Sequence, residues 1–205
     1  MLMAKTKALY LFIFFFYAMI KICLAVDTIF SYQSIIDGNG TLISSGNIFE
    51  LGFFSPGKSK YRYLGIWYKR TPDVIVWVAN RDNPLTDSSG ELRISNNSNQ
   101  LLLLNSSKII IWSSYSSSKR VKKTPVAQLL DSGNLILRDM SSDIYLWQSF
   151  DYPTDTHLPG MKLGWDSRTD LERYLTSWKS ADDPSKGDFT YRMGISGLPQ
   201  TVLAM

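Results

Sequence analysis

Three related runs set the pattern of this chain: Val74-Ile75-Val76-Trp77, Ile109-Ile110-Ile111-Trp112 and Ile144-Tyr145-Leu146-Trp147. Each run ends in a tryptophan, and both intervals between these tryptophans are 35 residues. Equal spacing of this size is typical of a repeated supersecondary unit. We therefore predict three copies of one small β-sheet, in which Trp77, Trp112 and Trp147 meet as core anchors rather than as ligand platforms.

Short β-rich runs fill the sequence around these tryptophans, separated by Gly, Asn, Ser, Pro and Asp. No stretch after Ala25 has a sustained 3.6-residue apolar period, and only residues 171–175 favour a helix. The sequence is therefore predicted to be all-β. The predicted strands are 48–54, 63–68, 74–78, 92–94, 101–104, 109–112, 127–130, 135–137 and 144–147.

The composition is that of a globular protein. The chain has 205 residues, of which 44% are hydrophobic and 20% charged, which is too apolar for disorder and too polar for a protein with many membrane spans. The length predicts one domain and part of a second.

The first 25 residues have the pattern of a secretory signal peptide. Lys5 and Lys7 precede an apolar run over 8–20, which is shorter than a membrane span, and small residues precede the expected cleavage after Ala25. Three lysines leave with this segment, so the formal net charge falls from +4 to +1. The basic balance belongs mostly to the leader, and we expect no nucleic-acid partner.

The position of the only cysteine and the presence of glycosylation sequons also fit a secreted chain. Cys23, the only cysteine, lies in the leader, so residues 26–205 are predicted to form no disulfide and no thiolate metal site. Three sequons, at Asn39, Asn96 and Asn105, predict glycans on surface loops. We expect no cofactor and no metal, and a location outside the cell or on the outer face of the plasma membrane.

Longer strings carry a family resemblance. The string DSGNLIL (131–137) resembles the repeat of bulb-type lectins, whose fold is a three-fold β-prism. The strings ELGFFSPG (50–57), YLGIWY (63–68), WVANRDNP (77–84) and WQSFDYPTDT (147–156) resemble the extracellular region of plant S-domain receptor-like kinases and S-locus glycoproteins. The tail, with LTSWKS (175–180), resembles the start of a second β-rich, S-locus glycoprotein-like region.

This resemblance implies a division of the chain. A signal peptide over 1–25 is expected to precede a bulb-type lectin domain over 26–155. Residues 156–205 are expected to form a linker and the truncated start of the S-locus glycoprotein-like region.

The resemblance also implies where a sugar would bind. Bulb-type lectins use the pattern Q-x-D-x-N-x-V-x-Y, whose polar groups bind mannose hydroxyls while the Val packs on the sugar ring. In the third copy Asn134 and Ile136 match, Ser132 replaces Asp, and Leu130 and Arg138 replace Gln and Tyr.

The other two copies fit the pattern less well. The second copy fits if it is anchored on Asn99, with Asn97 at the Asp position, or after a slip of one residue onto Gln100. In the first copy only Ile66 and Tyr68 fit, with Arg62 at the Asp position. Because these motifs have lost polar groups, we expect mannose binding to be degraded.

Enzyme chemistry has little support in the sequence. His157, the only histidine, is predicted to lie in a surface turn, and the pair Asp151 and Asp155 in a capped turn around a proline rather than a glycosidase site. The sequence contains no phosphate loop, His-Arg-Asp or Asp-Phe-Gly motif of a kinase. Kinase activity is expected only if the chain is the N-terminal piece of a complete receptor.

The expected function is therefore recognition. Predicted partners are a protein ligand or co-receptor, a mannose-type glycan, or a second copy of the chain; contact with a membrane would require a C-terminal span missing from this sequence. A basic cluster at 119–123 is expected to be a solvated loop or a dock for an acidic partner.

Overall fold

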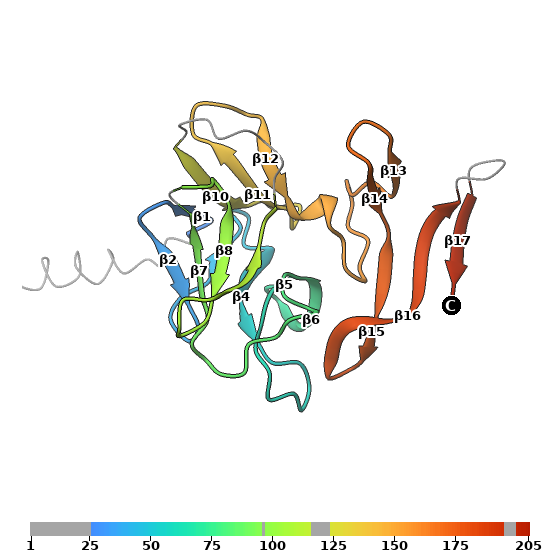
Figure 1. The fold of residues 1–205 in the computed structure, drawn as a ribbon, viewed down its shortest axis with the longest axis horizontal. Helices are drawn as coiled ribbons and strands as arrows, with labels where there is room; N and C mark the ends of the chain where they lie inside the picture. The colour runs from blue at the N-terminus through green and yellow to red at the C-terminus, as the bar shows by residue number, and fades with distance from the viewer. Residues whose placement is uncertain (1–25, 96, 116–123, 195–199) are drawn as a thin grey trace, which may run out of the picture.

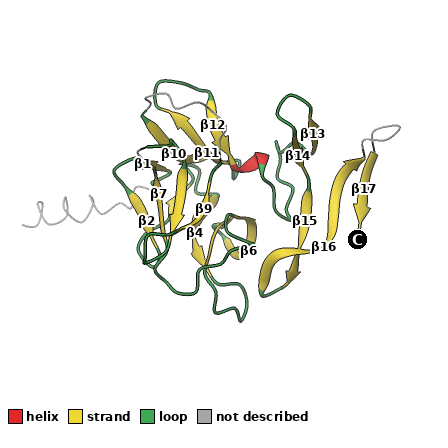
Figure 2. Ribbon diagram, in the orientation of Figure 1, coloured by secondary structure: helices red, strands yellow, loops and turns green. Residues whose placement is uncertain are grey.

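A computed structural model gives the structure of residues 26–95, 97–115, 124–194 and 200–205 (Figure 1). The predicted signal peptide, Asn96 and the basic cluster at 119–123 lie outside the described residues. Within the described residues, strands dominate, and the one helical element is the short 3-10 helix η1 (Ser149–Asp151) (Figure 2).

Three antiparallel four-stranded sheets form the first part of the molecule. The first sheet contains β3 (Leu42–Ile43), β4 (Phe49–Phe54), β5 (Tyr63–Tyr68) and β6 (Thr71–Val78). The second contains β2 (Ser34–Ile36), β7 (Glu91–Ile94), β8 (Leu101–Leu104) and β9 (Ile110–Ser113). The third contains β1 (Thr28–Phe30), β10 (Pro125–Leu129), β11 (Leu135–Asp139) and β12 (Tyr145–Gln148). The all-β, three-fold β-prism expected from the sequence is confirmed.

The N-terminal segment ties the three sheets together. Its successive strands β1, β2 and β3 pair with β10, β7 and β4, so each sheet receives one edge strand from residues 28–43. Two of the three sheets are therefore completed by long-range pairing, of β1 with β10 and of β2 with β7, whereas β3 pairs with β4, the next strand along the chain.

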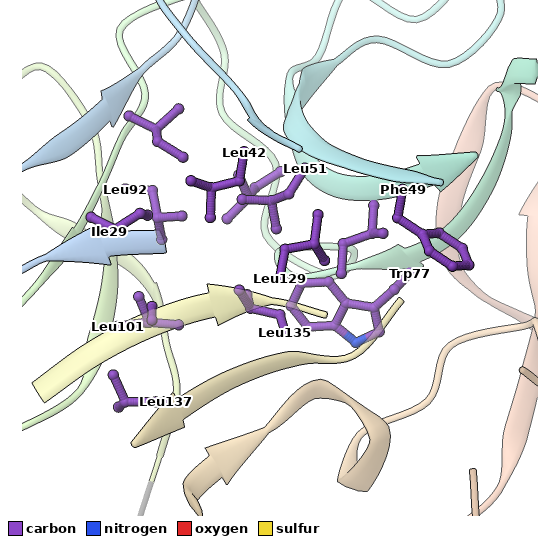
Figure 3. Close-up of a cluster of buried hydrophobic side chains, with 14 of the residues drawn as sticks. Ile29, Leu42, Phe49, Leu51, Trp77, Leu92, Leu101, Leu129, Leu135 and Leu137 are labelled. Atoms are coloured by element: carbon purple, nitrogen blue, oxygen red, sulfur yellow. The ribbon is translucent and has the colours of Figure 1, made fainter. Parts of the chain in front are cut away.

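The core lies between the inner faces of the three sheets (Figure 3). Side chains on a strand alternate between faces, so every second residue of β5, β8 and β11 enters the core. These inner residues are Leu64, Ile66, Leu101, Leu103, Leu135 and Leu137, all completely buried.

The tryptophans of the three repeats lie together. The ring centroids of Trp77, Trp112 and Trp147 are 5.7–6.0 Å apart, and each pair is arranged edge to face. Trp77 and Trp147 are buried, while Trp112 is only partly buried. Edge-to-face contacts of this kind stabilise aromatic clusters beyond their buried area.

The C-terminal part adds two smaller β units beside the prism (Figure 1). One is the hairpin of β13 (Gly164–Asp166) and β14 (Leu171–Arg173), and the other is the sheet of β15 (Leu175–Ser180), β16 (Asp183–Gly194) and β17 (Gln200–Ala204). The helix predicted over 171–175 is wrong, because β14 pairs with β13 and β15 with β16 across these residues.

Candidate functional site

The structure fixes which residues of the three repeats are equivalent. In each sheet one inner strand residue lies opposite the tryptophan: Ile66 opposite Trp77, Leu103 opposite Trp112, and Leu137 opposite Trp147.

A second observation gives the same alignment. Two residues before each of these positions, a backbone N–H donates to a polar side chain that follows the tryptophan. The bonds run from Leu64 to Asn80 (2.8 Å), from Leu101 to Ser114 (2.8 Å) and from Leu135 to Ser149 (2.9 Å). The equivalents of Asn134 are therefore Tyr63 and Gln100.

In the second copy, the structure selects between the two sequence anchors. Asn99 has a φ of 49° and occupies the place of Gly133, whose φ is 83°, so both are left-handed turn residues. Gln100 therefore takes the motif position, and Asn97 and Asn99 lie in the turn between β7 and β8.

In the first copy, the fold moves the alignment by one residue. Ile66 points into the core, and Tyr68 packs against it, with its ring 4.7 Å from that of Phe49. Because faces alternate along a strand, a shift of one residue exchanges inner for outer side chains. The outer positions in this copy are those of Tyr63, Gly65 and Trp67, not those of Ile66 and Tyr68.

The polar groups near the first copy are already paired. Arg62 donates from Nε to Asp37 at 2.8 Å, and this hydrogen bond raises the pKa of Arg62 despite its partial burial. Burial also raises the pKa of Tyr63, and the negative charge of Asp183 adds to this effect. The first copy therefore offers a neutral, buried phenol where the motif requires an amide.

In the third copy, Asn134 is held by bonds within the protein. Its Nδ2 donates to Gln148 at 2.9 Å, and its Oδ1 accepts from the Ser149 hydroxyl at 3.1 Å and from the Phe150 N–H at 3.2 Å. Only 5% of its surface is exposed. These bonds join the residue before β11 to the end of β12 and to η1, so the side chain has little capacity left for a sugar hydroxyl.

The neighbours of Asn134 complete the outer face of the third sheet. Ser132 is exposed in the turn before β11, whereas Ile136 is buried between Gln128 and Gln148 of the flanking strands. Gln128 donates to Asp27 at 2.9 Å. The structure brings Asn134, Ser132 and Ile136 together, but it provides no carboxylate at the motif's Asp position.

Exposed apolar side chains occur in the last hairpin of each sheet, near the turn that precedes β6, β9 or β12 or at the start of that strand. We call these residues the hairpin ends, and the sequence did not single them out as exposed. Val74, Ile109 and Ile144 each stand three residues before the tryptophan of their repeat, and they are 47%, 60% and 75% exposed. Ile110 and Tyr145 beside them are 55% and 43% exposed. The repeat identified these residues as apolar, but periodicity alone could not tell which end of the run leaves the core.

The predicted glycosylation sites differ in what the structure shows. Asn39 is exposed in the turn after β2. Asn105 follows β8 and accepts the Ile109 N–H through Oδ1 at 3.0 Å, while Asn96 lies outside the described residues. Glycosylation at all three stays a prediction.

The candidate catalytic groups are engaged in structural contacts. The Nε2 atom of His157 lies 3.3 Å from the Met161 carbonyl oxygen. Asp151 forms an ion pair with Arg173 at 2.7 Å, and Asp155 accepts a hydrogen bond from the Thr156 hydroxyl at 3.3 Å. Over 26–95, 97–115, 124–194 and 200–205, no cluster of three or more metal-ligating side chains occurs. In the same residues no helix is long and apolar enough to span a membrane.

Comparison with known proteins places these features in a family context. Residues 74–179 match the family model described as D-mannose binding lectin. The chain is 49% identical to the S-locus-specific glycoprotein S6 of Brassica oleracea, over 94% of this chain and 45% of that protein. It is 48% identical to the receptor-like serine/threonine-protein kinase SD1-8 of Arabidopsis thaliana, over 88% of this chain and 22% of that protein. The chain thus spans less than half of the length of these relatives.

Solved structures with a similar fold include bulb lectins. A monomeric mannose-binding lectin from Gastrodia elata matches with a TM-score of 0.45 and 19% identity, over 60% of this chain and 93% of that one. The mannose-specific agglutinin of snowdrop (Galanthus nivalis) matches with a TM-score of 0.38 and 14% identity, over 58% of this chain and 94% of that one.

Proposed function

Since this chain belongs to the D-mannose binding lectin family, and its relatives include S-locus glycoproteins and receptor-like kinases, we propose that it is an extracellular recognition module whose ligand is a protein. The chain itself carries no kinase motif. In this proposal it acts by binding, with no catalytic step of its own.

The main support is the state of the three motif positions. They hold Tyr63, Gln100 and Asn134, and the only asparagine among them is bonded to Gln148, Ser149 and Phe150. A site that recognises hydroxyls loses discrimination when its fixed polar groups are missing or occupied. The outer faces therefore have few free polar groups with which to bind mannose.

The exposed apolar hairpin ends support a protein ligand. Ile109, Ile110, Ile144 and Tyr145 stand at the starts of β9 and β12 or next to them, and all are exposed. Aliphatic and aromatic side chains of this kind supply the buried centre of protein interfaces. A sugar, by contrast, is held by a concave site with several convergent polar groups.

A glycan array tests the outer faces directly. The glycosylated protein is compared with Asn134→Ala, and we expect no mannose signal that the substitution removes. Strong binding to mannose-terminated glycans that Asn134→Ala abolishes would overturn the proposal.

A screen against secreted plant proteins and receptor ectodomains tests the protein ligand. We expect at least one pair whose affinity falls at least tenfold, about 1.4 kcal/mol, when Ile110 and Ile144 are both changed to Ser. Ser88→Ala, an exposed position outside the hairpin ends, serves as the control. If every interaction found is indifferent to the double variant, the hairpin ends are not the binding surface.

The alternative hypothesis is that the chain is the N-terminal part of a receptor-like kinase that phosphorylates serine or threonine with ATP. It is favoured by the 48% identity to SD1-8, of which the chain spans only 22%. Reading the transcript beyond the codon for Met205 tests it. A frame that continues into a membrane span and kinase motifs supports this hypothesis, and an immediate stop codon supports a short secreted protein.

A further inference from the structure

A cavity lies where the prism meets the C-terminal strands. Its volume is about 310 Å³, and it opens at the end of the prism that carries the tryptophan cluster. Its lining includes Trp77, Trp112, Trp147 and Tyr152 from the prism side, and Glu172 and Lys186 from β14 and β16.

The aromatic wall of this cavity is held in place. The Tyr152 ring stacks on that of Trp147, with centroids 5.8 Å apart and an interplanar angle of 13°. The Trp77 indole N–H donates to the Tyr152 carbonyl at 2.9 Å. Tyr152 is nevertheless 42% exposed. A fixed aromatic surface of this kind binds a ligand with little loss of conformational entropy.

The opposite wall is fixed by Arg81. This buried side chain of the prism donates to the carbonyl oxygens of Pro184 at 2.6 Å, Ser177 at 3.0 Å and Thr176 at 3.3 Å. Burial lowers the pKa of Arg81, and the nearby carboxylate of Asp82 opposes this effect. The guanidinium N–H groups of Arg81 therefore bond to the opposite wall, and we do not count Arg81 as a ligand-binding cation.

The charged groups at the cavity are paired with one another. Lys186 lies 3.9 Å from Asp82, Arg192 lies 3.8 Å from Glu172, and the third pair joins Arg173 and Asp151. A ligand with a net charge would have to compete with one of these pairs. A neutral ligand can add hydrogen bonds to the carboxylates and the ammonium group without separating them.

Trp112 and Trp147, which line the cavity, each carry one indole N–H donor. Within the described residues, no group accepts a hydrogen bond from the indole N–H of Trp112 or Trp147. The two nitrogen atoms are also not among the fully buried polar atoms that lack a partner, so solvent reaches both of them. The cavity lining thus combines aromatic side chains, the three carboxylates of Asp82, Asp151 and Glu172, and the ammonium group of Lys186.

We propose that this cavity binds one neutral glycosyl residue of a glycan or glycoside. The apolar C–H face of a pyranose ring would pack on the aromatic wall, and its hydroxyls would meet Asp82, Glu172 and Lys186. The volume is at the lower end of the range for small-molecule sites, about 300–1,000 Å³, which favours a single ring. The site is separate from the outer sheet faces, and the inference goes beyond the proposed function without resting on it.

Indole N–H signals give a direct readout of this site. The full chain is secreted from cells fed with ¹⁵N-tryptophan, and the signals of its 6 tryptophans are assigned with Trp→Phe variants. The probes are the methyl glycosides of α-mannose, β-glucose, β-galactose and β-xylose, with Nα-acetyl-lysine amide as a cationic peptide comparator. We expect at least one glycoside to give saturable shifts of Trp112 and Trp147, while Trp165, half exposed on β13, stays unchanged.

Substitutions then locate the binding. Tyr152→Leu and Lys186→Met each weaken the glycoside by about tenfold, or about 1.4 kcal/mol, while Trp165→Phe and Asn134→Ala leave it unchanged. Lys186 is exposed, so its variant remains informative if Tyr152→Leu folds poorly.

Three results would overturn the proposal. The first is that no glycoside shifts either indole signal, and the second is that only the lysine amide does so. The third is a glycoside affinity that Asn134→Ala abolishes and Lys186→Met leaves unchanged, which would place the sugar on the outer face of the third sheet. A protein ligand can fail to be found while the glycoside shifts remain, so this test and that of the proposed function fail independently.

Discussion

Asn134 shows at the scale of one residue how a motif position can become structural. Its amide, just before β11, bonds to Gln148 at the end of β12 and to Ser149 and Phe150 of η1, and all of these bonds lie inside the protein. The sequence placed an asparagine at the right position for a sugar site. Only the structure reveals that its hydrogen-bonding capacity is already used.

Asn134→Ala is therefore expected to destabilise the fold. The change leaves the Ser149 hydroxyl and the Phe150 N–H without their acceptor, at a cost of about 2–3 kcal/mol. Urea unfolding measures this loss, with the exposed Ser132→Ala as the control, which should change stability by less than about 0.5 kcal/mol. An Asn134→Ala protein as stable as the parent would contradict the structural role.

Asp27 gives a second prediction at this scale. Its carboxylate accepts from the Thr28 hydroxyl at 2.7 Å, the Ser45 hydroxyl at 2.7 Å and Gln128 at 2.9 Å, which links β1, the turn after β3, and β10. Burial acts to raise the pKa of Asp27, but the three donors outweigh it and the pKa is lowered.

The sign of the pH dependence follows from that shift. A lowered native pKa stabilises the fold above the unfolded pKa, about 3.9, and this contribution is lost as the pH falls through the native pKa. Asp27→Asn should cost about 1–2 kcal/mol at neutral pH, and the cost should vanish in strong acid. Urea unfolding at both pH values checks this. An equal cost at both would show that the charge is irrelevant.

At the scale of elements, the 35-residue spacing predicted three sheets, and the short β-rich runs predicted most of their strands. The sequence did not predict β1, β2 and β3, since each has only two or three residues, and β1 and β2 pair with strands far away in the sequence. Strand pairing also decided the register of the motif. Sequence alone could not choose between Asn99 and Gln100, because the choice depends on which residue takes the left-handed turn conformation.

The tryptophan cluster makes a prediction for the elements it joins. Trp77 is 2% exposed, and Trp77→Ala should cost about 3–5 kcal/mol. Trp112 is only partly buried and is expected to cost less when changed to Ala. Thermal unfolding of the two variants measures the order, and a larger loss for Trp112→Ala would contradict the described packing.

At the scale of the whole molecule, Arg81 joins the prism to the C-terminal strands. The string WVANRDNP (77–84) identified Arg81 as part of a family pattern. Its partners, the backbone carbonyls of Thr176, Ser177 and Pro184, could not be predicted from the sequence. A hydrogen bond from a side chain to a distant backbone carbonyl does not depend on the identity of the residue that carries the carbonyl, so no local sequence pattern indicates it. The cavity at this junction was unpredictable for the same reason.

Arg81→Met should loosen the C-terminal strands from the prism. The carbonyl oxygens lose a buried partner, at a cost of about 2–4 kcal/mol, while the prism keeps its own core. Limited proteolysis with trypsin should then cut within residues 156–205 faster than in the parent, with Ser132→Ala, an exposed position on the prism, as the control. Equal cutting rates in the Arg81→Met and parent proteins would refute the role of Arg81.

Mapping of backbone-amide shifts during a titration with methyl α-mannopyranoside tests the central claim most directly. That claim is that the outer sheet faces lack the free polar groups that bind mannose in the motif. The account predicts that the amides of 100–102 and 134–138 keep their positions throughout the titration, wherever else in the molecule signals move. Saturable shifts confined to 134–138 and the neighbouring Gln148 would contradict it.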